Sequence, residues 1–358
     1  MQWQGGYCTI RDKRKLEHIK LAESLPDGPL STGFADIHLL HDPLPEMALE
    51  EVDLGIQFAG KDLSLPILIN AITGGTGQAV RINHALAVIA EKYGLALAVG
   101  SQTIALEDPG WRDSFTVVRD ANPGGLIIAN ISARAPVEDA LQAVEMVQAD
   151  ALQLHLNVPQ ELAMWEGERD FRGILKNIRQ ITRHCPVPVI AKEVGFGLSR
   201  EAAGRLHAEG VKILDVGGAG GTNFISIEDR RGGLFNRELD DWGIPTAISL
   251  AEVAASGLPV EIIATGGIRT APDAAKALAM GAAMVAMSGS ILKLLLRDGY
   301  EVLDQQVGAF LYRLRAVFLM CGARNCQEIR QKPLIIRGDT ASWLESRGID
   351  PRRWGRRG

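Results

Sequence analysis

The chain has 358 residues, of which 46% are hydrophobic and 23% are charged, a composition typical of soluble globular proteins. Its net charge of −5 provides no overall basic field, which argues against a nucleic-acid or membrane-surface protein. The four cysteines have neither metal-ligand spacing nor a disulfide framework, and no apolar run approaches the ~20 residues that span a bilayer. We therefore expect a cytoplasmic protein. The cysteines are Cys8, Cys185, Cys321 and Cys326.

The first sixty residues are irregular and polar. The segment Arg11–Lys20 carries a basic cluster on a possible short helix. Two interpretations stay open: a solvated charged face, or an arm that closes over an anionic substrate. We expect loops at Ser31–Phe34 and His38–Pro45, followed by a short strand at Val52–Phe58.

From Pro66 onward, short apolar runs alternate with segments of helical spacing. Continuous apolar runs are typical of strands that are buried on both faces. The eight runs are Pro66–Ala71, Leu95–Val99, Gly125–Asn130, Ala151–Leu156, Pro188–Ala191, Val211–Val216, Val260–Ala264 and Ala283–Met287. The helical segments include Ala79–Lys92, Val137–Gln148, Phe171–His184, Arg200–Ala208 and Ala271–Met280.

Eight such units in succession predict a single (β/α)8 barrel rather than a doubly wound sheet. We expect three regions: an arm and substrate-closing segment at 1–60, a catalytic barrel at 61–300, and a helical extension with a basic tail at 301–358. Within the extension, Tyr300–Met320 is a candidate helix for contacts between subunits.

Glycine follows the last two predicted strands, in the pairs Gly266-Gly267 and Ser288-Gly289. Glycine allows backbone N–H groups to approach a ligand closely, and a helix N-terminus adds partial positive charge. In barrels of this class, the loops after the seventh and eighth strands commonly bind phosphate. The two pairs together therefore predict a phosphate cup.

Polar residues follow every apolar run, where a barrel builds its active site. In the fourth unit, Gln153, His155 and Asn157 alternate with leucines, so the three polar side chains share one face of a strand. This pattern favours a polar site in the barrel. Lys192 directly follows the fifth run, and we interpret it either as a partner for Glu193 or another inward carboxylate, or as a counter-charge for an anionic ligand.

Several motifs in the same order resemble the type 2 isopentenyl-diphosphate isomerases, which are FMN-dependent. The motifs are Arg14–Ile19, Thr73–Gly75, Gly100–Gln102, Gln153–Glu161, Lys192–Gly197, Gly220–Phe224, Asp241–Gly243 and Gly266–Arg269. The resemblance implies a barrel that holds FMN and converts isopentenyl diphosphate into dimethylallyl diphosphate with Mg²⁺.

Matched position by position, the resemblance implies four groups of site residues. The flavin and its ribityl chain would contact Ala71, Ile72, Thr73, Ser101, Asn130, Lys192 and Thr222. The phosphate of FMN would be held by Gly267, Ile268, Arg269, Ser288 and Gly289. The substrate would contact Arg14, Lys15, His18, Ser101, Gln102, His155, Asn157 and Gln160. Magnesium would bind Glu161, and the catalytic residues would be Gln160, His155 and Lys192.

The implied reaction is a redox-neutral 1,3-proton shift on reduced FMN, with NADPH as the reductant of the flavin. Gln160 is a poor acid or base by itself, so we interpret it as orienting or relaying the proton. The family also suggests a homotetramer or homo-octamer. Neither the assembly nor a separate NADPH-binding fold is visible in the sequence.

Two residues depart from the family pattern: Ile72 stands where methionine is usual, and Gly217 where serine is usual.

Two alternative functions stay open. A 2-hydroxy-acid oxidase would share the phosphate cup but would need His followed by Gly-Gly-Arg after a late strand, a pattern absent from 215–221. A non-catalytic flavin- or phosphate-binding scaffold would not need the polar row from Gln153 to Glu161. A purine-nucleotide dehydrogenase fits poorly, because no cysteine lies on a predicted barrel loop.

Overall fold

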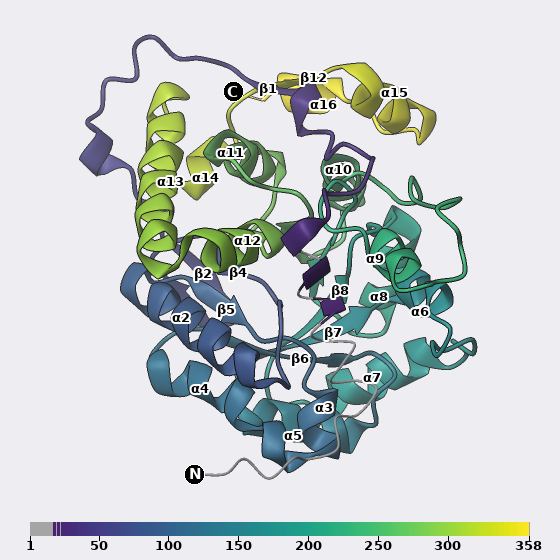
Figure 1. The fold of residues 1–358 in the computed structure, drawn as a ribbon. Helices are drawn as coiled ribbons and strands as arrows, with labels where there is room; N and C mark the ends of the chain where they lie inside the picture. Colours follow the sequence, from purple (N-terminus) through teal and green to yellow (C-terminus); the bar gives the residue numbers. More distant parts are fainter. Residues whose placement is uncertain (1–16, 19, 22, 358) are drawn as a thin grey trace.

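The computed structural model describes every residue except 1–16, 19, 22 and 358. Arg14 and Lys15 therefore lie outside the described residues. At its centre is a closed barrel of eight parallel strands that follow one another around the ring in chain order (Figure 1). The strands are β4 (Ile67–Ile69), β5 (Ala96–Ala98), β6 (Ile127–Ser132), β7 (Ala151–Leu156), β8 (Val189–Glu193), β9 (Ile213–Asp215), β10 (Glu261–Thr265) and β11 (Met284–Met287). The predicted (β/α)8 barrel is confirmed.

Helices surround the barrel, and several of them begin or end at ordinary capping signals. For example, Thr76 caps α2 by accepting from the backbone N–H of Ala79, and Gly94 ends it in the left-handed region with φ of 66°. The α-helices between barrel strands are α2 (Gly77–Tyr93), α3 (Thr103–Glu107), α4 (Asp113–Ala121), α5 (Val137–Met146), α6 (Val158–Ala163), α7 (Ile174–His184), α8 (Arg200–Ala208), α9 (Phe224–Arg230), α10 (Thr246–Ala255) and α11 (Ala271–Met280). Short 3₁₀ turns lie at η1 (Phe34–Asp36), η2 (Leu49–Glu51) and η3 (Pro109–Trp111).

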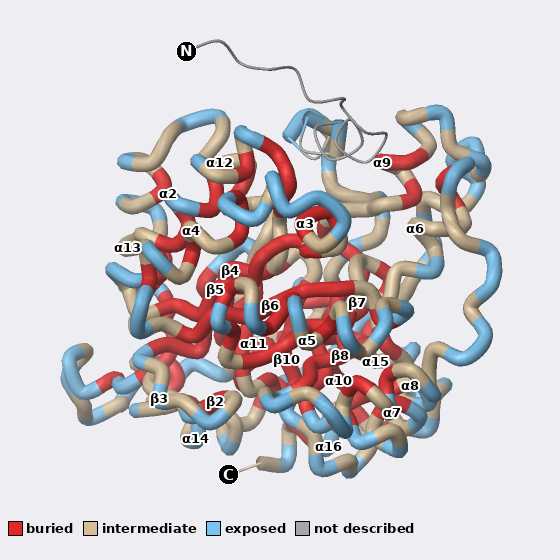
Figure 2. The backbone as a smooth tube through the Cα atoms, turned by 90° about the horizontal axis from the view of Figure 1, so that it is seen from below, coloured by how far each residue is buried: buried red, intermediate tan, exposed pale blue. Residues whose placement is uncertain are grey.

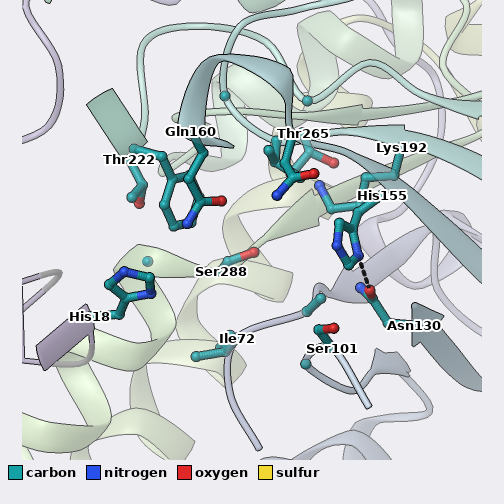
Figure 3. A pocket seen from close by; sticks show the side chains of 18 of the residues that line it. His18, Ile72, Ser101, Asn130, His155, Gln160, Lys192, Thr222, Thr265 and Ser288 are labelled. Atoms are coloured by element: carbon teal, nitrogen blue, oxygen red, sulfur yellow. Dashed lines mark hydrogen bonds between the residues drawn. The ribbon is translucent and has the colours of Figure 1, made fainter. Parts of the chain in front are cut away.

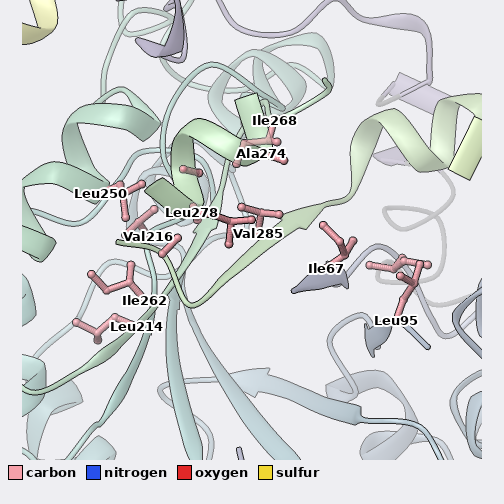
Figure 4. Close-up of a cluster of buried hydrophobic side chains, with 14 of the residues drawn as sticks. Ile67, Leu95, Leu214, Val216, Leu250, Ile262, Ile268, Ala274, Leu278 and Val285 are labelled. Carbon is pink, nitrogen blue, oxygen red and sulfur yellow. The ribbon is translucent and has the colours of Figure 1, made fainter. Parts of the chain in front are cut away.

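The outer faces of the strands pack against these helices. Leu214, Val216 and Ile262 point toward Leu250 of α10 and Leu278 of α11 (Figure 4). All of them are at most 4% exposed. Figure 2 shows the result: buried strands at the centre, with exposure confined to the outer sides of the helices and to loops. Burial of this apolar surface is the main source of the barrel's stability.

A second apolar cluster fills the lumen of the barrel. It takes inward residues from the strands, including Leu68, Ile128, Ile190 and Ile263, together with Phe58. Phe58 belongs to the antiparallel hairpin of β2 (Ile56–Phe58) and β3 (Lys61–Leu63). The predicted strand Val52–Phe58 is therefore shorter than expected, and its last residue packs into the N-terminal end of the lumen.

A small sheet joins the segment before the barrel to the segment after it. β1 (Ile37–Leu39) pairs antiparallel with β12 (Leu334–Ile336). The expectation of a loop at His38–Pro45 is therefore wrong at its start, because His38 pairs with Ile335 in this sheet. The remaining helices are α12 (Gly289–Asp298), α13 (Tyr300–Met320), α14 (Cys326–Ile329), α15 (Gly338–Ser346) and α16 (Arg352–Gly355). Across the described part of the chain, none of the helices combines the length and the apolar character that a membrane crossing requires.

Candidate active site

A cavity of about 850 Å³ opens at the C-terminal ends of the barrel strands (Figure 3). This is the range of small-molecule and cofactor sites, ~300–1,000 Å³. Most of the residues expected from the sequence line it. They are His18, Ala71, Ile72, Thr73, Ser101, Asn130, His155, Asn157, Gln160, Glu161, Lys192, Thr222, Gly267, Ile268, Arg269, Ser288 and Gly289.

Gln102 is the described residue of the expected set that the structure does not bring to the cavity. Its side chain is fully buried behind Asn130. The amide oxygen of Gln102 accepts from the backbone N–H of Asn130 at 2.9 Å, and its nitrogen donates to the backbone oxygen of Ala143 at 2.9 Å. Gln102 therefore holds the backbone of β6 instead of facing the cavity.

The lumen face of the strands changes from apolar to polar two residues beyond the apolar cluster. Leu68 is followed by Asn70, Ile190 by Lys192, and Ile263 by Thr265 on the same face, because side chains alternate along a strand. The same step places Gln153 after Ala151 and Asp215 after Ile213. A polar layer therefore lies on an apolar one: its Lys192 and Thr265 line the cavity, whereas Asn70, Gln153 and Asp215 are buried beneath it. The alternation predicted in β7 is the local part of this pattern.

Lys192 lies in this polar layer with Asp215 as its buried counter-charge. Its Nζ is 3.5 Å from Oδ2 of Asp215 and donates to the backbone oxygen of Glu193 at 3.0 Å. Asp215 also accepts from Thr265 Oγ1 at 2.6 Å. Lys192 thus pairs with an inward carboxylate, which was the first of the two interpretations. The partner is Asp215, not the Glu193 carboxylate. The ammonium still reaches the cavity wall.

The Glu193 side chain turns away from Lys192 and holds the loop after β8. Its Oε2 accepts from the backbone N–H groups of Gly195 at 2.8 Å, Phe196 at 2.5 Å and Gly197 at 3.0 Å. Burial raises the pKa of Glu193 to about 8, against these three amides and the nearby Lys192 charge, which act to lower it. The loop that edges the cavity is thus tied to a carboxyl group at the end of β8.

Glu228 is a site residue that the sequence analysis missed. It lies on α9, is 1% exposed, and its Oε1 accepts from Gln160 Nε2 at 3.2 Å. The same Oε1 is 2.8 Å from His18 Nε2, and Arg231 binds the other oxygen. Burial acts to raise the pKa of Glu228, but hydrogen bonds and charge from His18, Arg231 and Gln160 leave it lowered. One feature of the sequence could have indicated Glu228: it is a carboxylate among apolar residues in the helix that follows the glycine-rich loop 217–221.

Glu161, the expected magnesium ligand, lies at the cavity wall near the start of α6. Its Oε1 accepts from Asn157 Nδ2 at 2.8 Å, and its Oε2 accepts from the backbone N–H of Glu168 at 2.9 Å. A carboxylate has about four lone-pair directions, so two accepted hydrogen bonds leave room for a cation. Among the residues that the structure describes, no group of three or more acidic, His or Cys side chains forms a metal cage.

The glycine loops after β9, β10 and β11 meet at one side of the cavity. A Cβ on Gly221 would lie 2.6 Å from the backbone nitrogen of Gly267, so this approach requires glycine. The N-terminus of the ten-residue helix α12 lies beside Thr222, and a Cβ on Gly289 would lie 3.0 Å from Thr222 Oγ1. Backbone amides and a helix N-terminus form a cradle that suits a phosphate group, which fits FMN.

Arg269 joins this cradle to the segment before the barrel. Its guanidinium donates to the backbone oxygens of Gly267 at 2.7 Å and Gly220 at 2.8 Å and pairs with Asp27. The backbone N–H of Gly28 donates to Gly221 at 3.0 Å, so this part of the N-terminal segment packs on the cradle. Asp27 lines the cavity and was also missed by the sequence analysis, since no local pattern connects it to the barrel.

Comparisons with known proteins agree with this site. Residues 146–336 match the family model described as FMN-dependent dehydrogenase. The isopentenyl-diphosphate delta-isomerase of Moorella thermoacetica is 50% identical over 94% of this chain and 97% of its own length. That of Symbiobacterium thermophilum is 48% identical over 95% of this chain and 97% of its own length.

Solved structures of lower identity share the fold. A structure described as a lactate oxidase from Pediococcus acidilactici has a TM-score of 0.69 at 16% identity and covers 91% of this chain and 93% of its own. A mandelate oxidase has a TM-score of 0.65 at 16% identity and covers 90% and 92%. At this identity the likeness concerns the fold alone. The near-complete relatives at 48–50% identity decide the assignment: the chain belongs to the isopentenyl-diphosphate delta-isomerase family, on an FMN-dependent dehydrogenase framework.

Proposed function

We propose that the chain converts isopentenyl diphosphate into dimethylallyl diphosphate by a redox-neutral 1,3-proton shift. One proton is added to the terminal alkene carbon and one is removed from the neighbouring methylene, so the atoms balance without net oxidation. One observation carries the proposal: a single cavity joins the glycine cradle on one side to His155, Asn157, Gln160 and Glu161 on the other. The first set suits a phosphate, and the second suits a polar substrate.

We assign FMN to the cradle side of the cavity. Gly267, Ile268, Arg269, Ser288 and Gly289 would hold its phosphate, and Ala71, Ile72, Thr73, Ser101, Asn130, Lys192 and Thr222 would line its ring and ribityl chain. When bound in its reduced form, FMN supplies an electron-rich face and an exchangeable proton beside the alkene. Lys192, held by Asp215, contributes positive charge that suits an anionic ring.

The substrate diphosphate is assigned to the side of the cavity that carries His18, Ser101, His155, Asn157 and Gln160, with Arg14 and Lys15 of the arm as further cations. A diphosphate favours cationic and N–H donors, which these side chains provide. Glu161 would hold Mg²⁺ against the diphosphate oxygens, since magnesium favours few carboxylates together with phosphate oxygens and water. Gln102 acts indirectly, because its side chain accepts a hydrogen bond from the backbone N–H of Asn130 and so holds that residue in place.

Proton handling is assigned to Gln160 together with Glu228, with His155 and Lys192 as the other catalytic groups. The amide of Gln160 donates to a buried carboxylate that also contacts His18. That carboxylate provides the acid–base capacity that a neutral amide lacks. Gln160 therefore orients or relays a proton, while the Glu228 carboxylate accepts the hydrogen bond of the Gln160 amide and carries the negative charge.

The wider setting completes the proposal. NADPH would reduce the flavin, the protein would act in the cytoplasm, and the family pattern favours a homotetramer or homo-octamer. Residues 1–60 would form an arm that closes over the substrate, 61–300 the catalytic barrel, and 301–358 the extension. On α13 of that extension, Tyr312 is 61% exposed and Met320 is 48% exposed, so this helix has apolar surface to offer another subunit.

The test is anaerobic turnover of isopentenyl diphosphate by the FMN-loaded protein with Mg²⁺, comparing chemically reduced with oxidised flavin. Allylic product that forms only with reduced flavin, without net flavin oxidation, is the expected result. Absence of product with bound reduced FMN would reject the isomerase. Replacing the chemical reductant with NADPH tests the reductant, and Glu161→Gln with a magnesium titration tests the metal assignment.

A further inference from the structure

A chain of four hydrogen bonds crosses the barrel lumen from the cavity wall to Asp215. His155 Nδ1 lies 2.8 Å from Asn130 Oδ1, and Asn130 Nδ2 lies 3.2 Å from Gln153 Oε1. Gln153 Nε2 then lies 2.9 Å from Asn70 Oδ1, and Asn70 Nδ2 lies 2.7 Å from Asp215 Oδ2. Figure 3 shows the first link, with His155 and Asn130 joined at the cavity wall.

The direction of this chain is fixed at its far end. An ionised carboxylate only accepts hydrogen bonds, so Asn70 must turn its NH₂ group toward Asp215. The backbone N–H of Ala71 independently donates to Asn70 Oδ1 at 2.8 Å, which requires the same orientation. A flipped Asn70 would place oxygen against carboxylate and NH₂ against N–H. Asn70 therefore has one allowed orientation.

Each later link inherits this direction. Gln153 must turn its NH₂ group toward Asn70 Oδ1, which leaves its oxygen to accept from Asn130 Nδ2. Asn130 then turns its own oxygen toward His155 Nδ1. Since an amide oxygen only accepts, His155 must carry a proton on Nδ1 and donate it.

We infer that Gln153 is a positioning residue that, through Asn130, holds His155 with its proton on Nδ1. Gln153, Asn70 and Asp215 are all fully buried, and none of the three lines the cavity. They therefore reach the cavity only through the side chains that they orient. A chain in which every donor points the same way is also strengthened by mutual polarisation.

The consequence lies at the other ring nitrogen. In the neutral ring, Nε2 carries a lone pair, and this nitrogen lies on the cavity side of His155 (Figure 3). Only the imidazolium would present an N–H there. The protonation of the ring follows from the hydrogen-bond geometry alone, whereas its effect on turnover rests on the proposed function.

The direct experiment is ¹⁵N NMR of the FMN-loaded protein labelled at its seven histidines, with His155 identified by the signals lost in His155→Gln. Protonated and unprotonated ring nitrogens have well-separated ¹⁵N shifts, so the spectrum reports the tautomer. We expect a protonated Nδ1 in wild type, with the proton exchange-protected. A neutral His155 protonated at Nε2 alone would overturn the inference, whether or not the protein turns over isopentenyl diphosphate.

Two variants of Gln153 provide the matched comparison. Gln153→Glu keeps an oxygen that accepts from Asn130, and burial favours its protonated form, whose O–H can donate to Asn70 Oδ1 in place of Nε2, so the Nδ1–H form should persist. Gln153→Leu removes that oxygen and frees Asn130 to flip, so Nδ1–H should no longer be the single form. We expect kcat/KM to fall roughly tenfold, the lower end of the effect known for partners that orient metal-binding histidines. An unchanged tautomer in Gln153→Leu, or a lost one in Gln153→Glu, would exclude the role of Gln153. If Gln153→Leu does not fold, wild type and Gln153→Glu still decide.

Discussion

Lys192 and Asp215 are register partners on the neighbouring strands β8 and β9, and their charged atoms lie 3.5 Å apart beneath the cavity. Asp215→Asn keeps the shape of the side chain but leaves the buried ammonium without its carboxylate. We expect it to lower the free energy of unfolding by roughly 3 kcal/mol, because removing one partner of a buried pair strands the other charge.

Urea unfolding measures this loss. Asp298→Asn is the control, since its pair with Arg297 lies on the surface, where such a pair is worth less than about 1 kcal/mol. Equal losses in the two variants would mean that Asp215 does not act as the counter-charge of Lys192.

Gly217 is required by its surroundings in this chain, although the family resemblance of the sequence led us to expect serine there. Its φ is 46°, and a Cβ would lie 1.9 Å from the backbone oxygen of Glu193, the atom that accepts from Lys192. We expect Gly217→Ser to destabilise the protein by about 1–3 kcal/mol through overpacking and to weaken FMN binding.

Chemical unfolding and fluorimetric flavin titration measure both effects. Gly204→Ser on α8 is the control, because a Cβ there meets open space. A Gly217→Ser protein with wild-type stability and flavin affinity would show that the β9 loop rearranges at little cost.

The pH dependence of the protein's stability should reveal the protonation of Glu228. Its pKa lies below the ordinary 4.5, so the folded state binds its proton less readily than the unfolded state. The stabilising contribution is therefore complete above about pH 4.5 and is lost as the pH falls through the lower folded-state value. Wild type should lose its stability advantage over Glu228→Gln on acidification below that point.

Thermal unfolding of both proteins between neutral and acid pH makes the comparison. Glu166→Gln is a suitable control, because Glu166 is exposed and also contacts Arg231. A difference between wild type and Glu228→Gln that grows on acidification would contradict the assigned direction.

Flavin binding should depend on the contact between two glycine loops. Excess FMN at a hundred times its Kd should stabilise wild type by about 2.7 kcal/mol. Gly221→Ala should bind FMN about tenfold or more weakly, because its Cβ would press on the Gly267 backbone at 2.6 Å. Thermal shifts with and without FMN measure the effect, and Gly124→Ala, whose Cβ meets open space, should match wild type.

Much of the fold was predictable because its signals are local. The apolar runs of the eight strands and the spacing of helices such as Arg200–Ala208 follow from burial on two faces or one. The row from Gln153 to Asn157 was visible because alternation along one strand places its polar side chains on one face. These patterns need only neighbours in sequence.

The remainder depends on contacts between distant segments. Glu228 meets His18 across 210 residues, and Asp215 meets Asn70 across 145, so neither pair leaves a local pattern. The family resemblance implied that Gln102 contacts the substrate, yet the first turn after β5 directs it toward α5. His38 was expected in a loop, because a three-residue strand is determined by its partner and not by its own sequence.

The pairing of β1 with β12 also sets an order of events during synthesis. Ile37 pairs with Ile336, so β1 leaves the ribosome long before the strand with which it pairs. At ~5–20 residues per second, this separation corresponds to roughly 15–60 s of translation. All eight barrel strands are synthesised within that interval. The β1–β12 sheet can therefore form only after every strand of the barrel has been made.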